Sequence, residues 1–178
     1  MSETTSLPSI FDLPLLSRVR RNHALEHATI HVLSERHSHL RLAGRSSFGG
    51  FAIYGNVPTD AVMAAAQEGL RRLQAGRWQM AIHPNCGSNL AVSGILAGAG
   101  AFLALGSLNR KPKSWIDRLS RLPFACTLAM LGIVLGRPLG SYLQARVTTQ
   151  PDVGDLRITD ITRQVRAGIL IHHVHTEG

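Results

Sequence analysis

Two long stretches of this 178-residue chain lack any charged side chain. Residues 89–108 read NLAVSGILAGAGAFLALGSL, and residues 122–136 read LPFACTLAMLGIVLG. A helix needs about 20 apolar residues to cross the hydrocarbon core of a bilayer, whereas buried helices of soluble proteins usually have apolar runs of about 10 to 14. The first stretch therefore predicts a membrane-spanning helix over 89–108. The second predicts another over 122–143, in which the Arg137 side chain reaches the lipid headgroups.

The connection between the two apolar segments is short and basic, and it carries Trp115, a residue typical of membrane interfaces. Small residues recur at four-residue spacing in the first segment, which lets two helices approach closely in lipid. These residues are Gly94, Ala97, Gly98 and Ala101. The sequence thus predicts a helical hairpin whose helices pack on each other, with self-association of helices from different copies as a further option.

Aromatic residues are also scarce, at 5% of the chain, although the formal net charge is +8. Proteins that bind nucleic acids combine basic stripes with aromatic side chains on which bases stack, and no such stripe is present. We therefore expect no nucleic-acid partner. Topology and attraction to anionic lipid explain positive charge around membrane segments, so the lipid bilayer is the expected partner.

The two cysteines, Cys86 and Cys126, are too few for a disulfide framework. Residues 1–22 have neither a basic start nor a long apolar core, so no cleavable signal peptide is expected. Basic residues both flank the hairpin and fill its loop, where they favour opposite orientations. The expected location is the bacterial inner (plasma) membrane, with the polar part of the chain in the cytoplasm.

The charged remainder of the chain predicts a small α+β domain. Helices are expected from Pro14 onward, after Asp12 as N-cap, and over 61–74, closed by Gly76. Strands are expected over 48–58, 77–84, 155–164 and 168–176. They give a small mixed sheet with two helices, interrupted by the two-helix transmembrane hairpin. The predicted domains are a flexible arm over 1–13, a polar α+β domain over 14–88 plus 147–178, and the transmembrane hairpin over 89–146.

One motif, HALEH, combines two histidines and a glutamate on the long N-terminal helix. Residues four apart on a helix lie one turn above each other on the same face, so His23 and His27 can both bind one metal ion. Imidazole is a good zinc ligand, and Glu26 lies beside the pair, where it can hold a water molecule or act as a base. His31 continues the spacing by a further turn. The alternative is a buried helix whose histidines bind backbone carbonyls.

HALEH resembles the H-x-x-E-H motif of inverted zinc metallopeptidases. The resemblance implies a third zinc ligand from a glutamate well downstream, and Glu68 in the second predicted helix best fits that role. His83 and Cys86, in the HPNCG turn before the first apolar segment, are the alternative, because imidazole and thiolate both suit zinc. The same turn can also be purely structural, since its proline, asparagine and glycine are turn-forming residues.

His172, His173 and His175 form a further group on the last predicted strand. Alternation along a strand places His173 and His175 on one face and His172 on the other. Two histidines on one strand face can bind a metal ion, although a histidine-rich edge strand is more often simply exposed.

Three segments, RRNHALEHATIHVL, FGGFAIYG and IHPNCGSNL, precede a glycine-rich apolar stretch. Together they resemble a family of bacterial membrane proteins from cyanobacteria and Chloroflexota that carries a domain of unknown function. The resemblance covers residues 18 to about 175. It implies a membrane location and no particular activity. The similarity to the zinc peptidases is limited to the five residues of HALEH, and this chain is far shorter than those enzymes.

The sequence therefore predicts a membrane-anchored metal-binding protein. In one version it is a zinc-dependent hydrolase of a protein or peptide, in which the HALEH histidines bind zinc and Glu26 is the base that activates a zinc-bound water. In the alternative it is a non-enzymatic membrane assembly or interaction protein with structural histidines. Haem binding through histidines is a third hypothesis, for which the sequence has no C-x-x-C-H motif.

Overall fold

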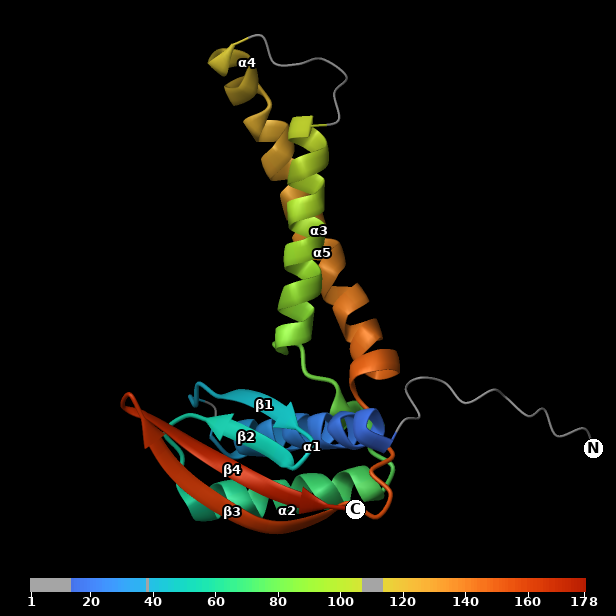
Figure 1. Ribbon diagram of the computed structural model, residues 1–178, viewed down its shortest axis with the longest axis vertical. Coiled ribbons are helices and arrows are strands. Elements are labelled where there is room, and N and C mark those ends of the chain that lie inside the picture. Colours follow the sequence, from blue (N-terminus) through green and yellow to red (C-terminus); the bar gives the residue numbers. More distant parts are fainter. Residues whose placement is uncertain (1–13, 38, 107–113) are drawn as a thin grey trace, which may run out of the picture. The chain divides into compact units, whose positions relative to one another are not determined.

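The computed structural model describes residues 14–37, 39–106 and 114–178, and the chain divides into two compact units (Figure 1). Unit 1 comprises Met1–His83 and Ala145–Gly178, and unit 2 comprises Pro84–Gln144. The predicted flexible arm over 1–13 and the first part of the predicted basic loop of the hairpin, up to residue 113, lie outside the described residues.

The described residues of unit 1 form two long helices and four strands. In chain order these elements, with one short 3-10 helix, are α1 (Pro14–Arg36), β1 (Ala43–Ser47), β2 (Gly50–Tyr54), α2 (Thr59–Gln74), η2 (Trp78–Ala81), β3 (Arg157–Arg166) and β4 (Ile169–Glu177). The strands form one sheet in the order β1-β2-β4-β3. The predicted α+β class is confirmed. The sheet is antiparallel in each of its three pairs and not mixed, because β1–β2 and β3–β4 are tight hairpins and β4 runs back along β2.

The two helices cover one face of this sheet, with α1 against β1 and β2 and α2 against β3 and β4 (Figure 1). They cross closely at Gly69 of α2, where a Cβ atom would lie 3.1 Å from Ala28 of α1. Between helices and sheet lies the hydrophobic core of unit 1. Its largest fully buried apolar side chains are Leu25, Leu33, Ile53, Val57, Val62, Val153, Leu156 and Val174.

One strand prediction is wrong. Residues 77–84 were expected to form a strand, but Trp78–Ala81 forms the 3-10 helix η2. Its turns are closed by bonds from the N–H of Met80 to the Arg77 carbonyl (3.1 Å) and from the N–H of Ile82 to the Gln79 carbonyl (3.1 Å). The carbonyls of Ala81 and Ile82 accept hydrogen bonds from histidine side chains of α1 and join no sheet. Tertiary contacts therefore override the local strand pattern.

Unit 2 is a helical hairpin. Its elements are α3 (Gly87–Gly106), the short α4 (Trp115–Ser120) and α5 (Leu122–Leu143), and α3 packs along α5 (Figure 1). A five-residue π-helix, η3 (Gln144–Thr148), follows α5 directly. The predicted segments 89–108 and 122–143 thus correspond to α3, apart from residues 107 and 108 outside the described part, and to α5.

Small residues let α3 and α5 approach closely, but mostly on α5. A Cβ atom on Gly132 would lie 2.6 Å from the Ala97 nitrogen, and one on Gly136 would overlap Ser93. Cβ atoms on Gly94 and Gly98, which were predicted to form the packing face, would meet no described atom within 4 Å. Of the predicted small residues, Ala97 is therefore at the hairpin interface, whereas Gly94 and Gly98 lie away from it.

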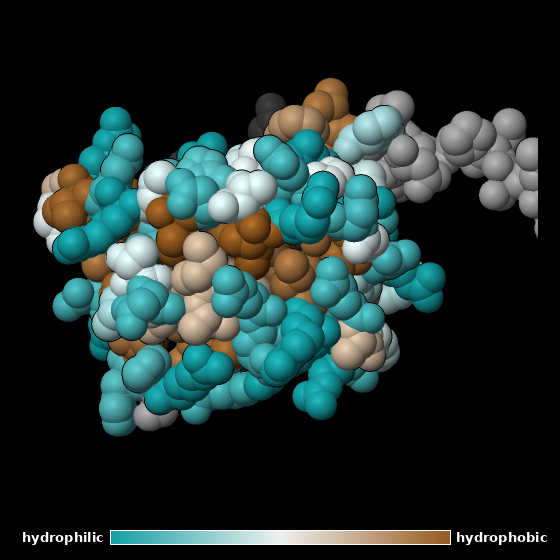
Figure 2. All heavy atoms as spheres, turned by 90° about the horizontal axis from the view of Figure 1, so that it is seen from below, coloured by the Kyte–Doolittle hydropathy of each residue, from teal (hydrophilic) through white to brown (hydrophobic). Residues whose placement is uncertain are grey.

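Within the described part of the chain, two helices could cross a membrane by length and composition: Gly87–Gly106 and Leu122–Thr148, the second running through η3. Arg137 lies within α5 and is exposed. Most large hydrophobic side chains on these helices are exposed, among them Leu90, Ile95, Phe102, Met130 and Val134. In contrast, unit 1 seen from below presents mainly hydrophilic residues, with hydrophobic ones in a band across the middle (Figure 2).

Candidate metal centre

Helix α1 carries three histidines at four-residue spacing, and their rings contact the end of η2, the segment after it and Thr148. The rings of His23 and His27 have centroids 4.3 Å apart, as the HALEH spacing predicts for side chains one turn apart. His27 is 1% exposed, and His31 lies a further turn along the helix. The His83 ring joins this row, with centroids 5.8 Å from His27 and 5.0 Å from His31.

Backbone carbonyls orient each of the three rings on α1. The Nδ1–H of His23 donates to the Thr148 carbonyl (2.9 Å), and that of His27 donates to the Ala81 carbonyl (2.7 Å). A carbonyl oxygen can only accept, so these contacts fix the tautomer that leaves a lone pair on Nε2. The His31 ring is turned the other way, because its Nε2–H donates to the Ile82 carbonyl (2.8 Å).

The Nε2 atom of His27 gives the strongest indication that this site binds a metal ion. It is buried, and it has no hydrogen-bond partner among the described residues. A buried polar atom without a partner costs about 1–3 kcal/mol. Histidines that bind metals typically donate one ring N–H to a carbonyl or carboxylate and present the other nitrogen to the ion. His27 has this arrangement.

His83 is held neutral by its surroundings. Burial, with smaller contributions from the neighbouring His31 and His27, lowers the pKa of His83 to about 4. At neutral pH its imidazole therefore carries a lone pair, which is the form that binds metal ions.

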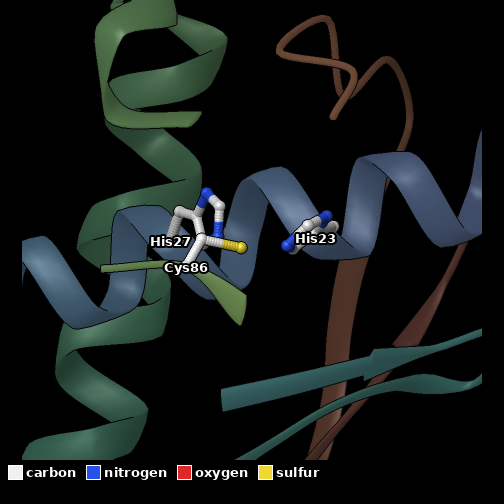
Figure 3. Close-up of side chains that lie close together, drawn as sticks. All are labelled: His23, His27 and Cys86. Atoms are coloured by element: carbon white, nitrogen blue, oxygen red, sulfur yellow. The ribbon is translucent and has the colours of Figure 1, made fainter. Parts of the chain in front are cut away.

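His23 and His27 of α1 and Cys86 of the HPNCG turn are residues whose side chains could hold a metal ion, and Figure 3 labels all three. Cys86 follows His83 by three residues, so the two Cα atoms are at most about 11 Å apart whatever the path of the chain. Its carbonyl accepts the first N–H groups of α3, from Asn89 (3.0 Å) and Leu90 (3.3 Å), and the Ser88 hydroxyl donates to its sulfur (3.2 Å). A helix N-terminus favours the thiolate form that binds metals.

Glu26 is buried and engaged with β1. Ser46 donates a hydrogen bond to its Oε2, and a Cβ atom on Gly44 would overlap its carboxylate. The glycine therefore makes room for the Glu26 side chain between α1 and the sheet. Whether Glu26 is a catalytic base stays a prediction.

Glu68 lies in an ion-pair network on α2. Its carboxylate accepts hydrogen bonds from Arg71 and from Arg72 Nε (2.6 Å), and Arg72 also pairs with Glu35 (2.7 Å). The hydrogen bond from Arg72 is the main cause that lowers the pKa of Glu68. Two arginines would compete with a metal ion for this carboxylate, so Glu68 is a weaker candidate ligand than the residues of the HPNCG turn.

The histidines of β4 divide between the two faces of the sheet. His172 is fully buried on the helix side, where its Nε2 lies 3.1 Å from the Thr59 hydroxyl. His173 and His175 line a shallow hollow on the opposite face together with Arg45, and the His175 Nε2 lies 3.2 Å from the Thr162 hydroxyl. None of the three belongs to the candidate metal group.

Sequence reasoning missed the carbonyls of Ala81, Ile82 and Thr148, for which no side-chain signal exists. It also missed Asn22, which is fully buried beside the motif. Asn22 donates to the Ser47 carbonyl (2.9 Å) and accepts from the Thr176 hydroxyl (2.7 Å), so it joins α1 to β1 and β4. A polar residue directly before HALEH on a helix with apolar sides is the signal that could have identified it.

The chain belongs to a family defined by a domain of unknown function, DUF6391, whose model matches residues 18–161. It is also similar to an uncharacterized protein of Picosynechococcus sp., with 36% identity over 140 residues. That match covers 74% of this chain and 65% of the relative, so the chain spans less than two thirds of the relative's length. No solved structure matches the chain. The predicted cyanobacterial family is confirmed, and the comparisons bring no activity with them.

Proposed function

We propose that this protein is a membrane-inserted metal-binding protein that holds a zinc ion on the HALEH face of α1. His23 and His27 each supply Nε2, and the turn after η2 supplies a further donor, the Cys86 thiolate or the His83 imidazole. The observation that carries the proposal is the buried, unpartnered Nε2 of His27, whose ring is oriented by the Ala81 carbonyl.

The donor types favour zinc over magnesium and calcium. Imidazole nitrogen and thiolate sulfur are the ligands of structural and catalytic zinc sites, whereas magnesium and calcium take oxygen ligands. A bound ion would be a partner for the Nε2 atom of His27, and it would remove the free-energy cost of burying that atom without one. Zinc bound to three protein ligands keeps a position for water, and bound to four it is structural.

The metal content of purified protein tests this proposal. The full chain is purified in detergent, loaded with zinc, dialysed against metal-free buffer and analysed by mass spectrometry for elements. We expect roughly one zinc per chain in wild type and its loss in His27→Ala. The matched control is His175→Ala, which removes an exposed histidine of β4 and leaves the zinc in place. Wild type that retains no metal after loading would overturn the proposal.

Cobalt substitution identifies the further donor and does not depend on the stability of one variant. A tetrahedral cobalt site with a thiolate ligand has a sulfur-to-cobalt charge-transfer band, which a site with nitrogen ligands alone lacks. If Cys86 is the donor, Cys86→Ser abolishes the band and His83→Ala keeps it. If His83 is the donor, the band is absent from wild type, and His83→Ala weakens binding.

Membrane insertion of the hairpin is supported by its exposed surface. Large apolar side chains that face outward all along α3 and α5 would be costly in water, at about 25 cal/mol for each Å² of apolar area. We propose insertion in the bacterial plasma membrane with unit 1 in the cytoplasm. Alkaline carbonate extraction tests insertion: the chain should stay in the pellet, and its release to the supernatant would contradict it. A reporter fused after Gly178 tests the orientation.

Zinc-dependent hydrolysis of a protein or peptide is the second candidate function, supported by the position of Glu26 between the two histidines of the motif. As a base it would take a proton from a zinc-bound water. Glu26→Gln separates this version from a non-enzymatic one. In a hydrolase the variant keeps zinc and loses the ability to cleave a peptide library. If wild type cleaves no peptide either, the hydrolase version is contradicted and the metal has a structural role.

A further inference from the structure

An open pocket lies in unit 1 at the end of α2, apart from the histidines. Its volume is about 540 Å³, within the range of about 300–1,000 Å³ that is usual for small-molecule sites. Two of its lining residues, Leu73 and Val153, belong to the hydrophobic core and are 4% and 1% exposed. Pro151 adds apolar surface beside them. The inner part of the pocket therefore suits apolar groups of a ligand.

Trp78 is the aromatic residue of this pocket. Gly76, with a φ of +81°, turns the chain out of α2, and the N–H of Trp78 donates to the Gly76 carbonyl (2.9 Å). This turn leaves the indole beside the pocket and 52% exposed, although tryptophan is a large and mainly apolar residue. The face of an indole attracts cations, and quaternary ammonium groups in particular.

Asp152 provides negative charge at the same pocket. Its Oδ1 accepts the N–H of Gly154 (3.1 Å), which fixes the orientation of the carboxylate and leaves further lone pairs free to bind a ligand. None of the described residues that line the pocket is positively charged. The nearby Arg21 pairs with Asp155 (3.4 Å), and Arg77 lines a different hollow with Glu68.

We infer that this pocket binds an alkylated ammonium group, held between the Trp78 indole and the Asp152 carboxylate with its apolar substituents against Leu73 and Val153. The group can belong to a free small molecule or to a lipid headgroup, because the chemistry that the pocket recognises is the same.

Tryptophan fluorescence tests this inference, because the chain has two tryptophans and Trp115→Phe leaves Trp78 as the sole one. The probe is tetramethylammonium chloride at constant ionic strength near 0.15 M, a salt level that screens the net positive charge of the chain. tert-Butanol is the uncharged probe of similar shape. We expect saturable binding of tetramethylammonium, none of tert-butanol, and about tenfold weaker binding in Asp152→Asn. Asparagine retains the oxygen that accepts from Gly154, so this variant should fold.

Asp155→Asn is the matched control, since it removes a neighbouring carboxylate that does not line the pocket, and its affinity should equal that of the parent. Saturation-transfer NMR of the probe's methyl protons provides a readout independent of the indole. Equal responses to both probes, or unchanged affinity in Asp152→Asn, would overturn the inference. If the site binds, phosphatidylcholine nanodiscs that compete with the probe identify a lipid headgroup, and free choline as sole competitor identifies a soluble ligand. The result is independent of the zinc proposal.

Discussion

The two units of this protein differ in which side chains they bury. Unit 1 buries large apolar residues such as Leu25 and Leu33. The buried residues of the hairpin in unit 2 are small or polar, for example Gly136, Ser93 and Asn89. Water drives large apolar groups inward, whereas in lipid helices associate through close packing of small residues and hydrogen bonds. The packing of unit 1 is therefore typical of a protein in water, and that of unit 2 agrees with the membrane insertion that we propose.

The largest expected effect is the difference in unfolding free energy between one Leu→Ala substitution in unit 1 and another in unit 2. Leu25→Ala empties a fully buried site of unit 1 and should cost about 3–4 kcal/mol of unfolding free energy. Leu103→Ala removes a side chain that is 55% exposed on α3 and should cost less than about 1 kcal/mol in detergent. Hydrogen–deuterium exchange of α1 and α3 peptides reports each unit. Equal costs would mean that the hairpin has a conventional core.

Next in size is the loss of the buried asparagine of each unit. Asn22→Ala removes two donated bonds and one accepted bond in unit 1 and should cost about 2–3 kcal/mol. Asn89 donates to the Pro84 carbonyl (3.0 Å) and accepts from Gln144 in unit 2. Asn89→Ala should cost only about 0.5–1.5 kcal/mol, because hydrogen bonds between membrane helices average about 0.6 kcal/mol. Thermal unfolding of the purified variants in detergent would measure both, and a reversed order would contradict the comparison.

A pair of glycines tests the packing rule inside the hairpin. Gly132→Ala places a methyl group against the α3 backbone and should destabilise unit 2 by about 1–3 kcal/mol. Gly94→Ala adds the same methyl group where no described atom lies within 4 Å, and should be neutral or stabilising by up to about 1 kcal/mol. Exchange rates of α5 amides distinguish them. If Gly94→Ala is the more harmful change, α3 packs through its other face.

The smallest effect concerns the pH dependence of unit 1. Burial, and to a lesser extent the charge of Arg163, lowers the pKa of His172. The unfolded chain therefore takes up a proton near pH 6.5 while the folded chain does not, so stability is full above that pH and falls as the pH drops below it. His172→Gln should reduce this fall in the unfolding midpoint between pH 7 and 5, to which His83 also contributes, whereas His175→Gln on the exposed face should not. An unchanged slope in both would exclude His172 as a cause.

Local patterns predicted most of the fold, because helix periodicity and apolar runs depend on neighbours in sequence. They also predicted that His23 and His27 share a helix face. The carbonyl of Ala81 could not be predicted, since it reaches His27 only through tertiary packing. Two signals were readable but unused. Arg71 and Arg72 stand three and four residues after Glu68, a spacing that pairs charges on a helix.

The second unused signal was the run Gly132, Gly136 and Gly140 on α5, which has the four-residue spacing of a packing face. The prediction used Gly94 and Gly98 of α3 instead, and these glycines do not lie at the contact between the helices. Both segments contain such a pattern, and which one is used depends on how the two helices rotate against each other, a choice that a single sequence does not reveal.

The central position of β4 in the sheet has a consequence for synthesis on the ribosome. Ile53 of β2 pairs with His172 of β4, and these residues are 119 positions apart in the chain. At about 5–20 residues per second, roughly 6–24 s separate the appearance of the two strands. During that interval the whole hairpin is made, while the edge of β2 that pairs with β4 in the folded protein stays unpaired. The nascent chain therefore needs protection from aggregation at the stage when the hairpin leaves the ribosome.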